Sequence, residues 1–187
     1  MHIPKKGLRA LGIAESYTGR SVSRLAGVVM RKDLRIDGFT FSTATVGGMD
    51  ATASILHMVN QLERRDINVI MLSGCVIAWF NITNPARIAQ ETGIPVICVT
   101  YEDSDGLIAD IRHHFPDDNE RISAYENLGE RIPVELHTHQ TIFIRCWGLE
   151  QSDAGRLCND FTLEGKIPEP LRVARLCARQ VSSINPD

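Results

Sequence analysis

Hydrophobic and polar positions alternate in three runs near the start of the chain. Residues 8–14, 22–30 and 36–46 are rich in β-forming side chains, and short polar segments separate them. The pattern predicts three strands with a turn over Tyr17 to Arg20. Because the connections are short, we expect neighbouring strands to be antiparallel.

The spacing of apolar residues changes after Ala51. Four of them recur at helical intervals and predict a helix that ends in the charged segment 63–66: Ile55, Met58, Val59 and Leu62. An apolar run over 68–72, a second helix closed by Gly93 and another apolar run over 95–101 follow. Strand–helix–strand order of this kind is typical of parallel strands, so the sequence predicts an α/β fold.

The rest of the chain predicts a C-terminal helical elaboration. Residues 105–115 are typical of a helix, 117–129 of a polar helix or loop, and 140–148 of a late strand. Two helices should follow, the second beginning near Pro168, since proline is tolerated in the first turn. No repeat or long linker interrupts the sequence, so we expect a single domain over 1–187.

Composition narrows the class of protein. The 187 residues are 43% hydrophobic and 23% charged, which is ordinary for a globular protein. No apolar run approaches the ~20 residues of a membrane helix, and the N-terminal segment lacks a signal-peptide core, so we expect a cytoplasmic protein. The five cysteines are unclustered and predict reduced core residues rather than a zinc site. A net charge of −3 excludes a global attraction to nucleic acid, so any basic surface must be local.

Candidate chemistry gathers where the predicted strands end. The run VIML gives way directly to Ser73 and Gly74, and ligands of open α/β sheets bind beyond the carboxyl ends of strands. Glu15 follows the first strand and Asp50 precedes the first helix. Carboxylates converging there could hold Mg²⁺, which takes oxygen ligands. Asp50 also suits a helix N-cap, and Glu15 a solvated loop.

Several stretches together resemble the endonuclease dU family, a mainly archaeal group related to endonuclease V. They are GIAESYTGR, TVGGMDAT, MLSGCVIAWFNI, GIPVICVTYEDSDG and KIPEPLRVARLCAR. The order of elements, three antiparallel strands followed by parallel strands with helices, matches a ribonuclease H-like mixed sheet. We therefore expect strand 8–14 to lie between strand 22–30, antiparallel to it, and strand 67–72, parallel to it. The family resemblance implies an endonuclease, dependent on Mg²⁺ or Mn²⁺, that acts on DNA or RNA containing uracil or hypoxanthine.

The sequence departs from the endonuclease V pattern at two strand ends. Aligned without gaps, Ala14 and Ser73 occupy the positions of two metal-binding aspartates, and a neutral hydroxyl is a poor substitute for a carboxylate. Glu15 can replace the first only if the strand has ended or bulges there, because adjacent strand residues face opposite sides. We therefore predict Glu15 and Asp50 as the metal ligands and catalytic residues, with their carboxylates close together.

Six residues are predicted to contact substrate: Tyr17, Ser73, Gly74, Asn81, Arg172 and Arg175. The two arginines lie at helical spacing and could contact phosphates, or form a solvated face with Arg172 paired to Glu169. The amide of Asn81 needs hydrogen-bond partners, which could be backbone groups or a base edge.

Two further patterns leave alternatives open. Trp79 and Phe80 could stack on an extruded base or belong to the core. His137 and His139 have metal-ligand spacing, but no third ligand is near and a structural role is favoured. The alternative functions are a nucleic-acid-binding protein that has lost its metal centre and a small-ligand protein using the same crevice. We leave enzymatic activity and a homodimer open.

Overall fold

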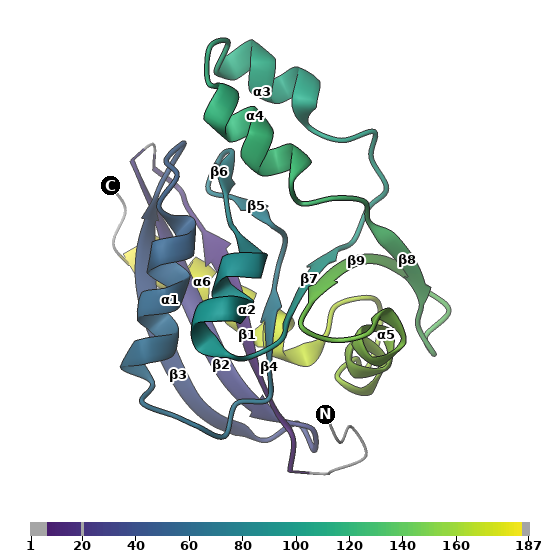
Figure 1. The fold of residues 1–187 in the computed structure, drawn as a ribbon. Coiled ribbons are helices and arrows are strands. Elements are labelled where there is room, and N and C mark those ends of the chain that lie inside the picture. The colour runs from purple at the N-terminus through teal and green to yellow at the C-terminus, as the bar shows by residue number, and fades with distance from the viewer. Residues whose placement is uncertain (1–6, 20, 185–187) are drawn as a thin grey trace.

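The structure, a computed structural model, describes residues 7–19 and 21–184. Its main feature is a seven-stranded mixed sheet with the strand order β3-β2-β1-β4-β7-β9-β8 (Figure 1). The strands are β1 (Arg9–Ser16), β2 (Val22–Arg31), β3 (Ile36–Thr45), β4 (Val69–Leu72), β7 (Val96–Thr100), β8 (Ile132–Glu135) and β9 (Thr141–Trp147). A separate two-stranded ribbon consists of β5 (Val76–Ile77) and β6 (Asn81–Ile82).

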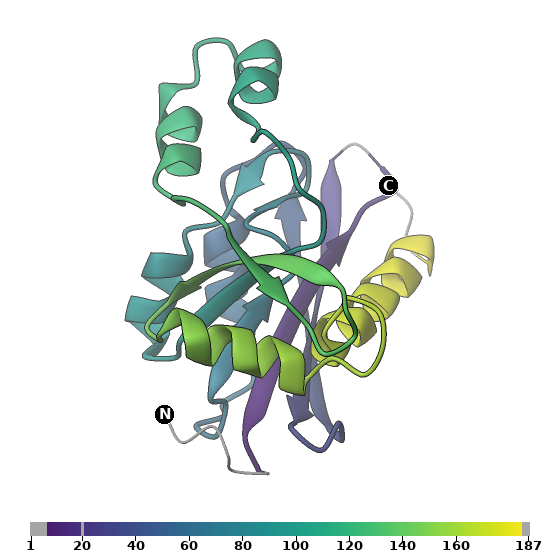
Figure 2. The ribbon, with the colours of Figure 1, turned by 90° about the vertical axis from the view of Figure 1, so that its right-hand side faces the viewer.

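Helices cover both faces of the sheet. They are α1 (Ala51–Gln61), α2 (Pro85–Thr92), α3 (Ile108–His114), α4 (Asn119–Glu126), α5 (Gln151–Asp160) and α6 (Glu169–Ile184). Figure 2 shows α5 and α6 on one face, while α1 and α2 lie on the other. Among the described helices, none is both long and apolar enough to cross a membrane.

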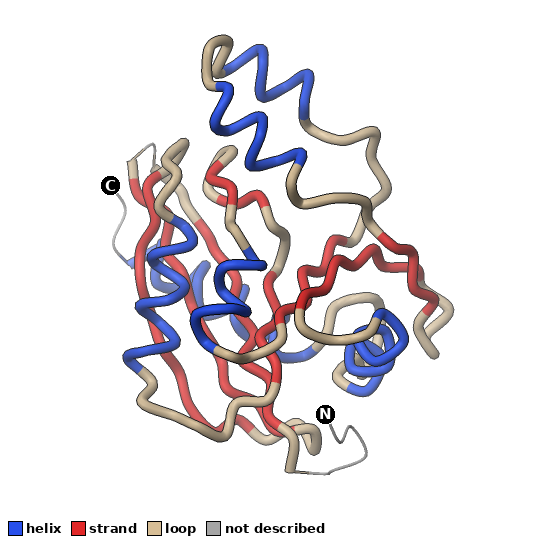
Figure 3. The backbone as a smooth tube through the Cα atoms, viewed as in Figure 1, coloured by secondary structure: helices blue, strands red, loops and turns tan. Residues whose placement is uncertain are grey.

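The strand order confirms the central prediction. β1 pairs with β2 in antiparallel fashion and with β4 in parallel, and β4 pairs in parallel with β7. The carboxyl ends of β1, β4 and β7 therefore meet at one edge of the sheet. The loops at this edge, the β5–β6 ribbon and the α3–α4 hairpin rise above it (Figure 3). Ligands of open α/β sheets bind outside such strand ends.

The sheet separates two apolar cores, one packed under each layer of helices. The core on the α1 side includes Ile13, Leu25, Ile55, Met58, Leu72 and Ile88. The core on the α6 side includes Ala14, Met71, Val99, Leu157, Leu171 and Ala174. At Gly12 the backbone of α6 comes so close that an added Cβ would lie 2.5 Å from Pro170. Only glycine fits there, and α6 begins at Glu169, beside the predicted Pro168.

The structure corrects the predicted end of the first strand. β1 continues beyond residue 14, because Glu15 and Ser16 still pair with Leu25 and Arg24 of β2. Without a break or bulge, Glu15 keeps the strand alternation and faces the opposite side from Ala14. The predicted turn after this strand includes Arg20, which lies outside the described residues.

Three short strands were not expected. β8 lies at the edge of the sheet and pairs only with β9, and β5 and β6 contain two residues each. Strands this short show too few alternating positions to be seen in the sequence. Segment 117–129, for which the sequence predicts a polar helix or a loop, contains α4. The side chain of its N-cap Asp118 accepts a hydrogen bond from the backbone N–H of Arg121 at 2.9 Å.

Candidate functional site

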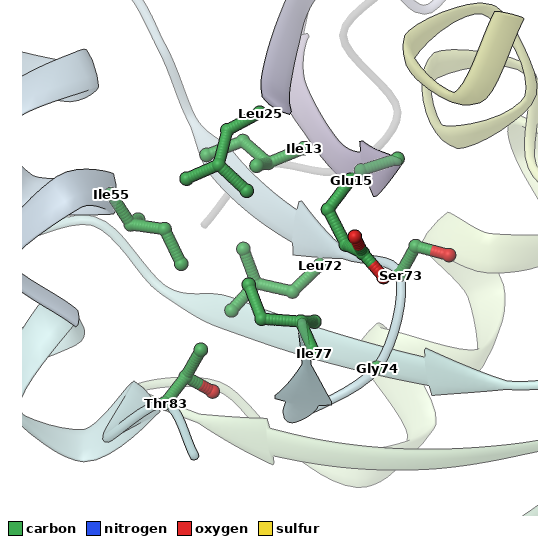
Figure 4. A pocket seen from close by; sticks show the side chains of 10 residues that line it. Ile13, Glu15, Leu25, Ile55, Leu72, Ser73, Gly74, Ile77 and Thr83 are labelled. Carbon is green, nitrogen blue, oxygen red and sulfur yellow. The ribbon is translucent and has the colours of Figure 1, made fainter. Parts of the chain in front are cut away.

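The carboxyl ends of β1 and β4 enclose a small cavity. Its volume is about 10 Å³, roughly the space that one water molecule needs. Figure 4 shows Glu15 reaching toward the loop that carries Ser73 and Gly74. The other lining residues are Ile13, Ala14, Leu25, Ile55, Leu72, Ile77 and Thr83. A nucleobase does not fit in this space, so the predicted pocket residues Ser73 and Gly74 border it without forming a base-sized pocket there.

Glu15 is held in place from the neighbouring strand. The buried hydroxyl of Ser23 on β2 donates a hydrogen bond of 2.5 Å to Glu15 Oε2. The carboxylate lies on the α1 side of the sheet, as do Ile13 and Leu72. This hydrogen bond fixes Oε2 of Glu15. Glu15 is also the carboxylate that lines the small cavity at the strand ends.

Ser73 extends the pairing of the two central strands. Its backbone N–H donates to the carbonyl of Ile13 at 2.9 Å. Its hydroxyl points away from the apolar cavity residues (Figure 4). Burial raises the pKa of Tyr101, while the Ser73 hydroxyl and the Arg175 guanidinium act in the opposite direction. Ser73 therefore belongs to a polar group on the α6 side of the sheet, away from the face that carries Glu15.

Asp50 is bound within its own loop. Its carboxylate accepts hydrogen bonds from the Thr45 N–H at 3.0 Å and the Thr45 hydroxyl at 2.7 Å. A third bond, of 2.6 Å, comes from the side-chain amide of Asn81. Partial burial alone would raise the pKa of Asp50, but the bonds from Thr45 and Asn81 outweigh it and lower the pKa. Asp50 occupies the N-cap position of α1, yet its side chain caps no amide of that helix.

Asn81 provides the helix cap instead. It is fully buried on β6, and its Oδ1 accepts from the backbone N–H of Ala51 at 3.1 Å. Its Nδ2 donates to Asp50 and, at 2.9 Å, to the carbonyl of Thr45. The partners of Asn81 are therefore backbone groups and one carboxylate. With both amide donors used, this side chain braces the site and offers no donor to a base.

The donor set restricts how a metal ion could be held. Among residues 7–19 and 21–184, no group of three or more His, Cys, Asp or Glu side chains could hold a metal ion. Glu15 and Asp50 bond to different partners, and Asp50 already accepts three hydrogen bonds. The residues do not fit a preformed two-ion centre. Of the two carboxylates, Glu15 is the one that could hold a single ion, because Mg²⁺ retains several of its waters and can be bound through one protein carboxylate.

The predicted basic contacts have intramolecular partners. Arg172 forms a two-pronged bond with the buried Glu169, with Nε–Oε1 and Nη2–Oε2 distances of 2.8 and 2.7 Å. The guanidinium of Arg175 lies 5.4 Å from the centre of the Tyr101 ring. Tyr17, in the turn after β1, is 39% exposed. Within the part of the chain that the structure describes, Tyr17 and Arg175 form no bond to a carboxylate.

The two histidines of the LHTHQ segment lie apart from these strand ends in sequence and structure. His137 follows β8, and its Nδ1 lies 2.8 Å from the side-chain oxygen of Asn159. His139 is in a turn with φ of 59°, so the extended backbone that would align the pair is absent at this residue.

A larger cavity lies beyond Gly74, between the ends of β4 and β7 and the α3–α4 hairpin. Its volume is about 130 Å³, and its walls are Gly74, Cys75, Val76, Thr100, Ser104, Leu107, Tyr125, Arg131 and Arg145. Arg131 is fixed by the carbonyls of Glu102 and Ser104, at 2.9 and 2.6 Å. Arg145 donates through Nε to a backbone carbonyl at 2.8 Å. No sequence motif points to these two arginines, because separate segments of the chain bring them together.

The comparison with known sequences is consistent along the chain. A family model described as "Endonuclease dU" matches residues 6–182. A UPF0215 protein of Pyrobaculum calidifontis is 39% identical over 176 residues, which cover 91% of this chain and 95% of that protein. A solved protein of unknown function from Archaeoglobus fulgidus has a TM-score of 0.80 at 28% identity, covering 93% and 98% of the two chains.

The fold is also shared with endonuclease V. The crystal structure of Ciona intestinalis endonuclease V, in complex with a 24-mer DNA containing an inosine followed by a ribo-adenosine, has a TM-score of 0.63. It is 13% identical and covers 95% of this chain and 87% of that one. This likeness confirms the predicted ribonuclease H-like fold, and the matched family confirms the resemblance seen in the sequence. The chain belongs to the endonuclease dU family.

Proposed function

We propose that this protein is an endonuclease that acts on nucleic acid containing a deaminated base, uracil or hypoxanthine. Membership of the endonuclease dU family supports a nuclease. The related fold of endonuclease V, solved with DNA that contains inosine, supports nucleic acid as the partner. The cavity beyond Gly74 is the observation that carries the choice of base.

The polar groups of that cavity suit a base that presents carbonyl oxygens. Arg131 and Arg145 line its wall, and a guanidinium only donates hydrogen bonds. Deamination replaces the exocyclic amino group of cytosine or adenine by a carbonyl, which accepts such bonds. The amino group of cytosine or adenine would instead oppose donor to donor, leaving polar groups unpaired. An extruded uracil or hypoxanthine is therefore favoured over the cytosine or adenine from which it arises.

Cleavage would take place at the neighbouring strand ends. Gly74 borders both the base cavity and the small cavity that contains Glu15. A Mg²⁺ or Mn²⁺ ion bound there would orient water and stabilise charge on the phosphate. Glu15, fixed by Ser23, is the protein ligand that we propose for it, and Arg175 and Tyr17 are proposed to contact the strand. Asp50 and Asn81 keep the surrounding loops in place.

The test is a cleavage assay on four oligonucleotides that differ at one base: uracil, cytosine, hypoxanthine or adenine. We expect cleavage of the deaminated strands with Mg²⁺ or Mn²⁺, none in EDTA, and none by Glu15→Gln. Arg145→Met should reduce the preference for uracil over cytosine. Arg87→Met, at an exposed position of α2, is the matched control and should leave this preference unchanged. Equal cleavage of all four strands would exclude the proposed base specificity.

A second candidate is a nucleic-acid-binding protein that recognises the same base without cutting. The neutral residues Ala14 and Ser73 at the strand ends, with Asp50 already hydrogen-bonded, favour it. It predicts tight, uracil-dependent binding in anisotropy titrations and no product with either metal. A small-ligand protein would instead bind free uracil or hypoxanthine, and its affinity would not increase when the base is part of an oligonucleotide.

A further inference from the structure

The turn between β5 and β6 has an unusual backbone. Ala78, Trp79 and Phe80 are consecutive, and their φ angles are 44°, 56° and 64°. Residues with a Cβ disfavour this left-handed region, because the side chain approaches the backbone. Such conformations persist only where the surroundings hold them, and they are concentrated at functional sites.

A buried arginine holds this turn. Arg121 on α4 is 4% exposed, and its Nη1 donates to the carbonyl of Phe80. It also donates to the carbonyls of Gly47 and Gly48, each at 3.0 Å. From the other side, the N–H of Gly47 donates to the carbonyl of Ala78 at 2.7 Å. One guanidinium thus ties the β5–β6 turn and the loop before α1 to the helical hairpin.

This framework presents Trp79 at the surface. The indole lies 5.2 Å from the ring of Phe115, 5.4 Å from that of His114 and 6.0 Å from that of Phe80, between ring centres. A Cβ on Gly47 would lie 2.9 Å from the indole, so the loop touches the ring directly. Trp79 nevertheless stays 44% exposed. The indole is fixed on several sides and still reaches water, which a core role does not explain.

We propose that Trp79 is a stacking surface for a nucleobase of the bound strand, outside the cavity for the extruded base. The turn stands at the edge where the strand ends meet, next to the α3–α4 hairpin (Figure 1). A rigid, exposed indole suits any base, because every base has a π-face. The ligand is an unpaired base of single-stranded or locally opened nucleic acid. This inference rests on the proposed function.

The test separates stacking from phosphate binding. In a Trp147→Phe background, Trp79 is the one remaining tryptophan of the two in the chain. Titration with an oligothymidine should quench its fluorescence, and an abasic oligonucleotide of equal length should not. Trp79→Leu should weaken oligothymidine binding roughly five- to hundredfold, the range reported for one stacked base. It should leave abasic binding and the salt dependence unchanged.

Controls keep the result specific. Phe39→Leu removes an aromatic ring of similar exposure, 47%, from the distant edge strand β3, and it should change neither titration. Trp79→Phe should retain part of the stacking, and thermal melts identify any variant that does not fold. Oligothymidine binding unchanged in both Trp79 variants, or an equal loss for abasic and base-containing strands, overturns the inference but not the proposed function. If the wild type binds neither strand, the inference is overturned, and the cleavage assay on the four oligonucleotides decides the proposed function separately.

Discussion

Asn81 on β6 donates a hydrogen bond of 2.6 Å to the carboxylate of Asp50 and accepts one from the first amide of α1. A single buried side chain thereby joins three elements beside the candidate site: the β5–β6 ribbon, the loop after β3 and α1. The stacking turn and the strand-end loops depend on this junction, so its loss should affect both stability and substrate binding.

Replacing Asn81 by Ala should destabilise the protein by about 1–3 kcal/mol, because the amide of the buried Ala51 and the carbonyl of Thr45 lose their partner. Urea unfolding measures the change. Asn84→Ala is the control, because it removes the exposed N-cap of α2. It should lower the free energy of unfolding by about 1 kcal/mol. A smaller loss for Asn81→Ala than for Asn84→Ala would contradict the bracing role.

The lowered pKa of Asp50 predicts a pH-dependent contribution to stability. A carboxyl whose pKa is lower in the folded state stabilises above its ordinary value of 3.8, and the contribution is lost as the pH falls through the folded value. The difference between wild type and Asp50→Asn should be about 1 kcal/mol at pH 7, because the group is largely solvated. Unfolding at pH 7 and in the acid range tests this, and a difference that persists in acid would assign it to packing.

Restoring an acid at the end of β4 should create metal dependence. Without metal, Ser73→Asp should cost about 1–3 kcal/mol, since it places a charge beside the largely buried Tyr101 on the α6 side of the sheet. With Mg²⁺ or Mn²⁺ the loss should shrink, because an ion that binds the folded state adds stability. Thermal melts with and without metal measure this effect. Ser73→Asn is the control, because its side chain has a shape similar to that of aspartate and carries no charge. Identical metal responses of the two variants would show that β4 does not end at a metal site.

The two arginines of α6 should behave differently. Arg172→Ala should destabilise the protein by about 1–3 kcal/mol, because it leaves the buried Glu169 carboxylate unpaired. Arg175→Ala should instead lower the slope of log affinity against log salt by about one, if its guanidinium neutralises one phosphate. Unfolding and salt titrations measure the two effects. An unchanged slope for Arg175→Ala would leave this residue with its Tyr101 contact alone.

Gly47 provides a test of how the stacking turn is supported. Alanine at Gly47 would adopt a φ of 70° and also press on the Trp79 indole. Gly93 is a matched control, with a φ of 67° and nothing within 4 Å of an added Cβ. Both variants should lose about 1–2 kcal/mol through backbone strain. Only Gly47→Ala should also weaken oligothymidine binding, and equal binding by the two would show that the indole tolerates the displacement.

The sequence by itself determined the order of elements and the central pairing of β1 with β2 and β4. The order follows from local periodicity, since the spacing of apolar residues reports whether each segment is a strand or helix. The pairing is expected because this order matches the ribonuclease H-like fold. The helical spacing of apolar residues predicted α1. Gly93, which has a positive φ, ends α2 as the sequence predicted. Motifs spread over most of the chain identified the family, and Ala14 and Ser73 already raised the question of the missing acids.

Only the tertiary structure decided which side chains meet. Glu15 faces away from Ala14 because pairing with β2 continues past the predicted strand end. Asp50 and Asn81 satisfy one another, although each read alone suits a ligand site. Arg121 becomes the clamp of the Trp79 turn through contacts separated by many residues along the chain. Such contacts depend on how layers pack and where loops cross, and a periodic pattern along one segment contains no information about its distant partners.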